Sequence, residues 1–216
     1  LLIFSYFGYN YLNNDNTDKP KIKIKNPIKK EDPIKVYEAS LIATGDGLLH
    51  STVYNAAYNR TSGTYDFSNM LTYTKEKIKD YDIKYYNQET IFDDNESYGG
   101  FPMFNSPSKF GTDMIDTGFN MVSLATNHSM DRGADSAKVS ADWWRAQKNV
   151  LVNGMASSEE DRTNYQIMEA NGITYTMLSY TYGTNGLGTS EINKEPYLVN
   201  LYSEELVKAD IEAVRD

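Results

Sequence analysis

Residues 119–128 read FNMVSLATNH, and this stretch decides the fold class. Its first seven residues, Phe119 to Ala125, are apolar enough for a strand that is buried on both faces. Three polar residues follow at once, Thr126, Asn127 and His128. Because strands buried on both faces belong to parallel sheets covered by helices, the stretch predicts an α/β fold with polar side chains at a strand's carboxyl end.

The same order of strand and polar residues occurs twice upstream. A first strand is predicted from Val36 to Thr44, and it stops at Gly45-Asp46-Gly47. A second strand, Tyr81 to Tyr86, runs into Asn87-Gln88-Glu89-Thr90. Helices are predicted between the strands, from apolar spacing and capping residues, over residues 51–59, 67–78, 106–115 and 134–147. Strands that alternate with helices predict a largely parallel sheet.

The last third of the chain carries a hairpin signal. Asn171-Gly172 lies between two strand-like segments, Tyr165 to Glu169 and Ile173 to Tyr180, and an Asn-Gly pair in that setting favours a tight hairpin turn. Further predicted elements are short strands at residues 150–152 and 197–201 and a final helix over 204–214.

Three polar groups therefore fall at predicted strand ends: Asp46, Asn87 with Glu89, and Asn127 with His128. Each has an ordinary interpretation alone, such as a turn or a surface histidine. Ligands of open α/β sheets bind beyond the carboxyl ends of the strands, where such groups meet. Together, the three groups predict one crevice that holds two carboxylates, amides and an imidazole.

This combination of side chains suits a divalent metal ion. Carboxylate, amide and imidazole groups are ligands for Mn, Fe, Zn or Mg, and two such ions could clamp a phosphate and activate water. His128 could instead act as a general acid, because the pKa of an imidazole lies near neutrality. The chain has no cysteine, which excludes a disulfide scaffold, a thiolate zinc site and a cysteine nucleophile.

Six strings of the chain, in this order and spacing, resemble the CapA family of capsule-synthesis proteins, which is linked to poly-γ-glutamate capsules. The most specific is the Ala-Thr-Asn-His-x-x-Asp-x-Gly segment at residues 125–133. The resemblance covers about residues 36–216. The strings are Ala43-Thr44-Gly45-Asp46, Asn87-Gln88-Glu89-Thr90, YGGFPMFNSP at 98–107, SLATNHSMDRG at 123–133, Asn171-Gly172-Ile173 and LSYTYGTNG at 178–186.

The resemblance implies a calcineurin-like, metallophosphoesterase-type α/β sandwich. It also implies roles for residues of the crevice. The implied metal ligands are Asp46, Glu89, Asn127 and His128, with Asn127 and His128 as the catalytic pair and a divalent ion (Mn, Zn, Fe or Mg) as cofactor. Asn87 and Asn105 are the candidate substrate-binding residues. Asp131 and Gly133 are expected to shape the turn after the site.

The chain departs from the metallophosphoesterase pattern in two places. Two residues after Asp46 stands Leu48 where a His is typical, and the nearest histidine is His50, which is either a ligand or a plain loop residue. No histidine follows His128, so the later His-Trp-Gly-type and His-Pro-His-type segments are absent. We therefore expect residues 36–216 to be a C-terminally truncated domain that binds metal weakly.

The chain has 216 residues and a net charge of −9, and its charges are unevenly distributed. Residues 1–35 carry seven Lys against four acidic residues, whereas residues 36–216 carry fourteen basic and 26 acidic residues. Residues 1–12 (LLIFSYFGYNYL) are interpreted as the end of an N-terminal membrane anchor, with a core strand or a disordered stub as alternatives. Residues 13–35 are interpreted as a Lys/Pro-rich tether. The acidic domain argues against nucleic acid as a partner.

Three hypotheses for the function follow. The first is a membrane-anchored, extracellular protein of capsule biosynthesis with a metal-dependent hydrolase site. The second is a non-catalytic scaffold or polymer-handling subunit on the same fold, with poly-γ-glutamate or its membrane synthase as partner. The third is a general extracellular metallophosphatase.

Overall fold

The structure is a computed structural model that describes residues 34–215. The predicted anchor, residues 1–12, and almost all of the tether, residues 13–35, lie outside the described residues. All the strands and helices of the described residues lie in one compact unit that begins at Tyr37. Within residues 34–215, none of the helices has the length and apolar character needed to cross a membrane.

The centre of this unit is a parallel sheet of four strands in the order β1-β4-β5-β6. The strands are β1 (Leu41–Asp46), β4 (Ile83–Asn87), β5 (Met121–Ser123) and β6 (Leu151–Asn153). The predicted parallel sheet is thus confirmed, although β1 starts and ends later than expected. Because of this shift, Asp46 is the last residue of its strand, after an irregularity in the pairing that follows Ala43.

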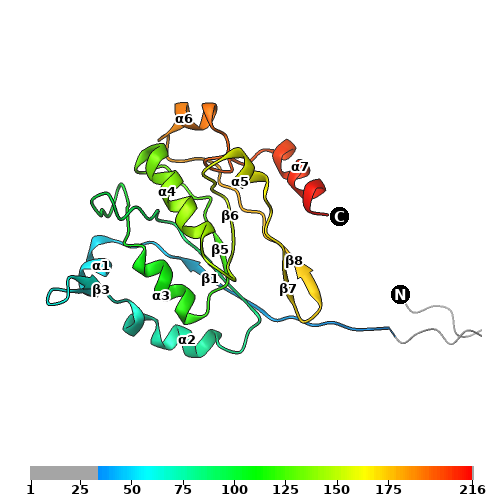
Figure 1. Ribbon diagram of the computed structural model, residues 1–216, viewed down its shortest axis with the longest axis horizontal. Coiled ribbons are helices and arrows are strands. Elements are labelled where there is room, and N and C mark those ends of the chain that lie inside the picture. The colour runs from blue at the N-terminus through cyan, green and yellow to red at the C-terminus, as the bar shows by residue number, and fades with distance from the viewer. Residues whose placement is uncertain (1–33, 216) are drawn as a thin grey trace, which may run out of the picture. The chain divides into compact units, whose positions relative to one another are not determined.

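Side chains alternate across the sheet, so its two faces differ. Tyr86, Val122 and Val152 point into the main core, where α3 (Lys109–Thr117) and α4 (Gly133–Arg145) cover them. On the other face, Ile83, Met121 and Leu151 form a smaller cluster beneath the hairpin of β7 (Met168–Ala170) and β8 (Ile173–Tyr175). Figure 1 shows α3 and α4 to the left of β5 and β6, and the hairpin of β7 and β8 to the right.

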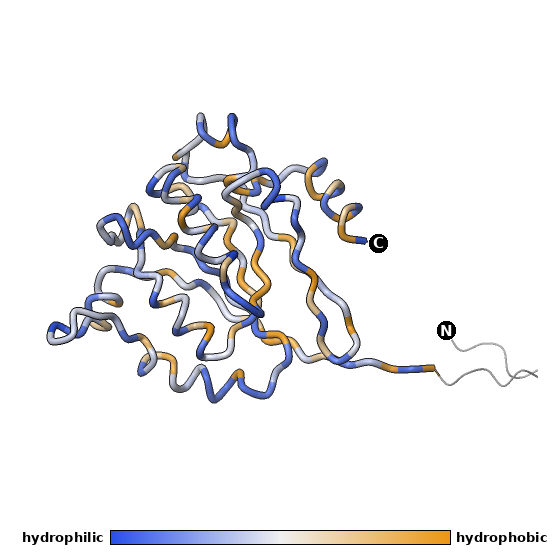
Figure 2. The backbone as a smooth tube through the Cα atoms, in the orientation of Figure 1, coloured by the Kyte–Doolittle hydropathy of each residue, from blue (hydrophilic) through white to orange (hydrophobic). Residues whose placement is uncertain are grey.

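Hydrophobic residues concentrate in the strands, and Figure 2 shows them as orange stretches at the centre of the domain. The peripheral helices carry polar residues outward. The remaining helices are α1 (Ser51–Ala57), the 3-10 helix η1 (Ser68–Leu71), α2 (Thr72–Ile78), α5 (Glu159–Thr163), α6 (Thr189–Lys194) and α7 (Glu204–Val214). A two-stranded ribbon joins β2 (Tyr58–Asn59) and β3 (Thr64–Tyr65).

The turn signals in the sequence agree with the backbone. Asn171 and Gly172 adopt φ values of 52° and 85° between β7 and β8, as the Asn-Gly signal predicts. Ser203 begins α7 by accepting a hydrogen bond from the Leu206 amide. The predicted strand at 197–201 is wrong, because Val199 and Leu201 make only isolated bridges, to Met155 and Thr181.

Candidate functional site

The strand register places one polar row along the carboxyl edge of the sheet. Asp46 pairs with Asn87, Asn87 with Ser123, and Ser123 with Asn153, so these residues lie side by side at the ends of β1, β4, β5 and β6. Gly154 follows with φ 122°, where a Cβ atom would lie 2.3 Å from the Ala125 nitrogen. A side chain at residue 154 would therefore disturb the backbone beside the row.

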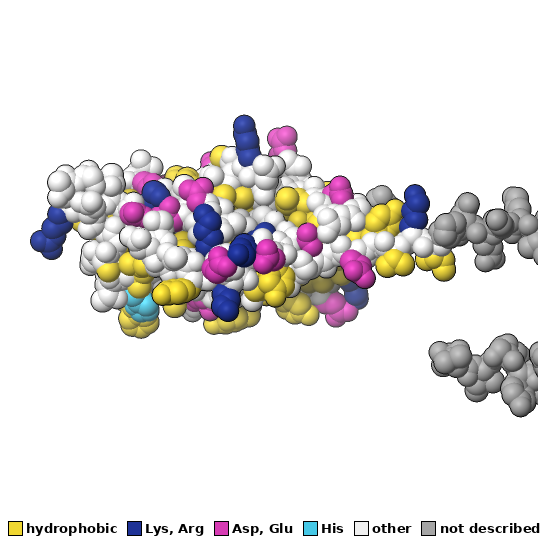
Figure 3. Space-filling model, turned by 90° about the horizontal axis from the view of Figure 1, so that it is seen from below, with side chains coloured by type: hydrophobic (Ala, Val, Ile, Leu, Met, Phe, Trp, Pro, Cys, Tyr) yellow, Lys and Arg dark blue, Asp and Glu magenta, His cyan; other side chains and the backbone are white. Residues whose placement is uncertain are grey.

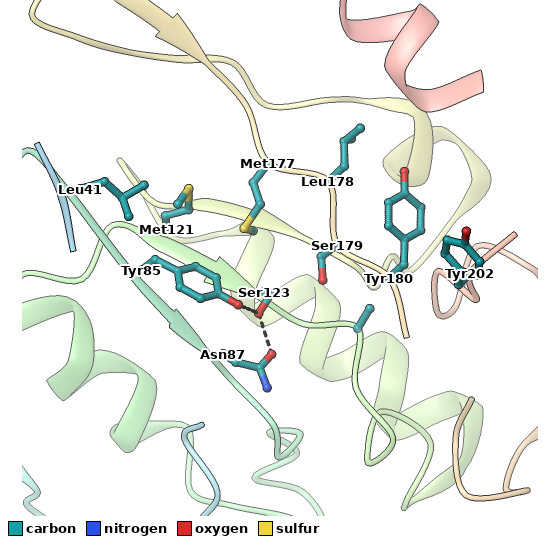
Figure 4. Close-up of a pocket in the computed structure, with 11 residues that line it drawn as sticks. Leu41, Tyr85, Asn87, Met121, Ser123, Met177, Leu178, Ser179, Tyr180 and Tyr202 are labelled. Carbon is teal, nitrogen blue, oxygen red and sulfur yellow. Dashed lines mark hydrogen bonds between the residues drawn. The ribbon is translucent and has the colours of Figure 1, made fainter. Parts of the chain in front are cut away.

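Hydrogen bonds orient the row. Asn87 Nδ2 donates to Asp46 Oδ1 at 2.8 Å, and Ser123 Oγ donates to Asn87 Oδ1 at 2.6 Å. The Tyr85 hydroxyl lies 2.7 Å from Ser123 Oγ and continues the chain (Figure 4). The amide of Asn87 is therefore fixed with its nitrogen toward the Asp46 carboxylate.

Glu89 lies beside Asp46 and His128. The loop after β4 is held by the Glu89 amide, which donates to Gly47 O, and by Thr126 Oγ1, which donates to Glu89 O at 3.0 Å. Glu89 Oε1 is 3.7 Å from His128 Nε2, and both side chains are mostly buried. Burial raises the pKa of Glu89, and the negative charge of Asp46 raises it further, while His128 acts to lower it. The predicted convergence of two carboxylates and an imidazole is present.

His128 is held from its other side by Asp131. His128 Nδ1 lies 2.8 Å from Asp131 Oδ2, and the Asp131 side chain is fully buried. The Phe104 amide donates to the same oxygen at 2.6 Å, and the Phe104 ring meets the imidazole edge to face at 4.7 Å. Burial raises the pKa of Asp131, while the bonds from Phe104 and His128 oppose that shift. From the sequence, Asp131 was expected to shape the turn alone; the His-x-x-Asp spacing was the signal for this contact.

Asn127 follows the same strand, and its side-chain amide contacts another loop. Its Nδ2 is 3.4 Å from Asn185 Oδ1, in the loop that precedes α6. This contact brings the Gly-rich loop at residues 182–188 next to the crevice. The side chain of Asn127 is half-buried, so its amide is accessible from the crevice mouth.

Asn105, a candidate for substrate binding, is a structural residue here. Its side chain is completely buried. Its Oδ1 accepts a hydrogen bond from the Asp93 amide and its Nδ2 donates to the Asp93 carbonyl, which closes the loop between residues 93 and 105. Both polar atoms of the amide are therefore occupied by hydrogen bonds within the loop.

His50, the other candidate histidine, is exposed and packs edge to face on Phe104 at 5.1 Å. Figure 3 shows a histidine at the surface among hydrophobic side chains, on a face where acidic and basic residues are interspersed. Phe104 thus contacts both imidazoles of the chain.

The donor types of the crevice fit a divalent cation: two carboxylates, an amide and an imidazole, with the raised pKa of Glu89 marking negative charge that a cation would stabilise. In the part of the chain that the structure describes, however, no group of three or more His, Asp or Glu side chains is arranged to hold a metal ion.

A cavity of about 630 Å³ adjoins the row on the hairpin side of the sheet. Asn87 and Ser123 belong both to the row and to the cavity wall (Figure 4). No local sequence pattern predicts this cavity, because its wall joins residues far apart in the chain. The lining has no charged side chain and consists of Leu41, Tyr85, Asn87, Met121, Ser123, Ala125, Met177, Leu178, Ser179, Tyr180 and Tyr202.

The sequence profile of one known family, described as bacterial capsule synthesis protein PGA_cap, matches residues 40–216. The chain belongs to this family. The match spans the whole sheet and every site residue discussed above, and it agrees with the resemblance seen in the sequence strings. A capsule synthesis protein of this family is expected to have a calcineurin-like α/β fold, and the parallel sheet flanked by helices fits it. A search of curated proteins found no match.

Proposed function

We propose that this capsule synthesis protein is a metal-dependent hydrolase of the phosphoesterase type, with its site in the crevice at the strand ends. The observation that carries the proposal is the convergence of Asp46, Glu89 and His128 from the ends of three neighbouring strands. The Glu89 side chain is mostly buried and lies beside the exposed Asp46 carboxylate, and both burial and that charge raise its pKa. Carboxylates with such shifted pKa values concentrate at functional sites.

The proposed ligands of a divalent cation are Asp46, Glu89, Asn127 and His128. Such an ion would supply Lewis-acid activation of a phosphate, acyl or amide bond and of water. The chain's own residues prepare the site: Asn87 orients the Asp46 carboxylate, and Asp131 holds the ring of His128. With Nδ1 held by Asp131, His128 faces the crevice through Nε2, where it acts as a ligand or as a general acid to a leaving oxygen.

The uncharged cavity beside Asn87 is the proposed place for the substrate's neutral portion. A carboxylate in this cavity would lose hydration without gaining a cationic partner from the lining. The acidic domain would also repel a polyanion such as poly-γ-glutamate unless cations intervene. The capsule polymer or its membrane synthase remains the proposed partner, and residues 1–12 are the proposed membrane anchor that holds the domain outside the cell.

A scaffold without catalysis is the second candidate. It is favoured by one observation, namely that residues 34–215 contain no ready group of three acidic or histidine side chains around a metal position. A general extracellular metallophosphatase is a third candidate that uses the same residues.

One comparison separates these functions. Full-length wild-type protein, Asp46→Ala and His128→Ala are tested for Mn²⁺ and Zn²⁺ binding by calorimetry and for hydrolysis of a chromogenic phosphodiester. His50→Ala is the matched control, because it removes the exposed histidine. We expect wild type and His50→Ala to bind and hydrolyse, and both site variants to lose metal affinity and activity.

The alternatives give different results in the same assay. Wild-type protein that binds neither metal and hydrolyses nothing, while capsule production still requires it, would favour the scaffold. Activity on many simple phosphate esters without any effect of the variants on capsule production would favour a general phosphatase.

A further inference from the structure

Asp131 is one of the most buried charged residues of the site. Its side chain has no exposed surface, and one of its oxygens, Oδ2, receives both the Phe104 amide at 2.6 Å and His128 Nδ1 at 2.8 Å. The other oxygen, Oδ1, is buried without a hydrogen-bond partner among the described residues. Both bonds to this carboxyl group are therefore concentrated on one oxygen.

The donors fix the direction of these bonds. A backbone N–H only donates, and an ionised carboxylate only accepts. Oδ2 already accepts the Phe104 N–H, and it accepts from His128 as well when the imidazole hydrogen sits on Nδ1. A neutral imidazole then has a lone pair on Nε2. That nitrogen is the one that faces Glu89 Oε1 at 3.7 Å.

We propose that Asp131 is a positioning residue that keeps the imidazole proton of His128 on Nδ1, so that Nε2 presents a lone pair to the crevice. In a metal site, such a partner sets both the tautomer and the ring orientation of its histidine. The functional meaning of the inference rests on the proposed function, in the form in which Nε2 of His128 is a metal ligand. Its test concerns the resting protein and needs neither metal nor substrate.

A purely structural role for Asp131 makes a different prediction. The carboxylate also ties the loop that carries Phe104 to the turn after β5. If that were its whole role, loss of the carboxylate would lower stability and leave the imidazole tautomer unchanged. The tautomer therefore separates positioning from simple support.

The experiment is ¹⁵N NMR of the imidazole nitrogens in full-length protein without metal, in alkaline buffer where a histidine of ordinary pKa is neutral. The chain has two histidines, so a His50→Gln variant assigns the signals of His128. In wild type we expect a pyrrole-like shift for Nδ1 and a pyridine-like shift for Nε2. In Asp131→Ala we expect both shifts to move to intermediate values, as the two tautomers exchange.

Asp135→Ala is the matched control, because Asp135 is an exposed carboxylate in the first turn of α4, only four residues after Asp131. It should keep the wild-type tautomer. A wild-type protein with the proton on Nε2, or a folded Asp131→Ala variant with unchanged shifts, overturns the inference. The wild-type measurement decides even if Asp131→Ala does not fold.

Failure of this inference can be told apart from failure of the proposed function. If the tautomer responds as expected and wild type binds no Mn²⁺ or Zn²⁺, the positioning role holds and the metal hypothesis fails. If the metal binds, loss of this partner should weaken its affinity about 10–100-fold.

Discussion

Two groups of side chains around a carboxylate, one at Asp210 and one at Glu89, have opposite electrostatic character. In the first, which ties α5 to α7, Asp210 accepts hydrogen bonds from Arg162 Nη2, the Tyr165 hydroxyl and the Tyr180 hydroxyl, at 2.6, 2.5 and 2.6 Å. In the second, at the strand ends, Glu89 lies next to another carboxylate, that of Asp46, and its nearest basic group is His128 at 3.7 Å.

The pKa shifts of the two clusters run in opposite directions. Burial acts to raise the pKa of Asp210, but the hydrogen bonds from Tyr165, Tyr180 and Arg162 outweigh it and lower the pKa. Burial raises the pKa of Glu89, and Asp46 adds to that effect. A carboxylate that is paired with a cation and hydrogen-bonded can support the fold. A carboxylate without such partners lowers stability, and proteins retain it at sites that bind a cation or a substrate. The contrast supports a structural role for the first cluster and agrees with the function proposed for the second.

The largest expected effect is at the compensated cluster. Asp210→Ala leaves the buried Arg162 guanidinium without its carboxylate, and we expect a loss of about 3–5 kcal/mol in the free energy of unfolding. Urea denaturation measures it. The double variant Arg162→Met/Asp210→Leu should recover part of that loss, because it leaves no unpaired charge. A single variant as stable as wild type would contradict the structural role.

Glu89→Gln should act in the opposite direction, and we expect it to raise stability at neutral pH by about 1 kcal/mol. A carboxyl group whose folded-state pKa is raised contributes most below its unfolded-state pKa, about 4.3, and that contribution is lost as the pH rises through the folded-state value. The advantage of the variant should therefore disappear on acidification below about pH 4. Melting temperatures at a series of pH values test this. An advantage that persists in acid would show that the raised pKa of Glu89 is not its source.

The smallest effect is expected for an exposed ion pair on the same helix as Asp210. Lys208 and Glu204 pair across one turn of α7, with side chains that are 68% and 71% exposed. Lys208→Ala should change the free energy of unfolding by less than about 0.5 kcal/mol, because water already screens both charges. This variant is the control for α7: a loss as large as that of Asp210→Ala would mean that helix docking, and not the buried charge, dominates.

Local sequence patterns predicted those site residues that lie at the ends of strands. Asp46, Glu89 and His128 were predicted to meet because the carboxyl ends of neighbouring parallel strands share one edge of a sheet. Asn105 shows the limit of this reasoning. It stands in a family-like string beside other polar residues, but its buried amide closes its own loop, and no sequence pattern reveals which way a loop amide turns.

The order of the four sheet strands and of the helices between them, the Asn-Gly hairpin, the family and the edge at which polar groups collect could all be inferred from the chain alone. These features depend on period, turn chemistry and strings of neighbouring residues, all of which are local. It took the folded domain to show that Tyr85, Ser123 and Asn87 form one hydrogen-bonded chain to Asp46, and that Asp131 holds His128. Hydrogen bonds depend on tenths of an ångström and on side-chain direction, and packing of the whole domain sets both.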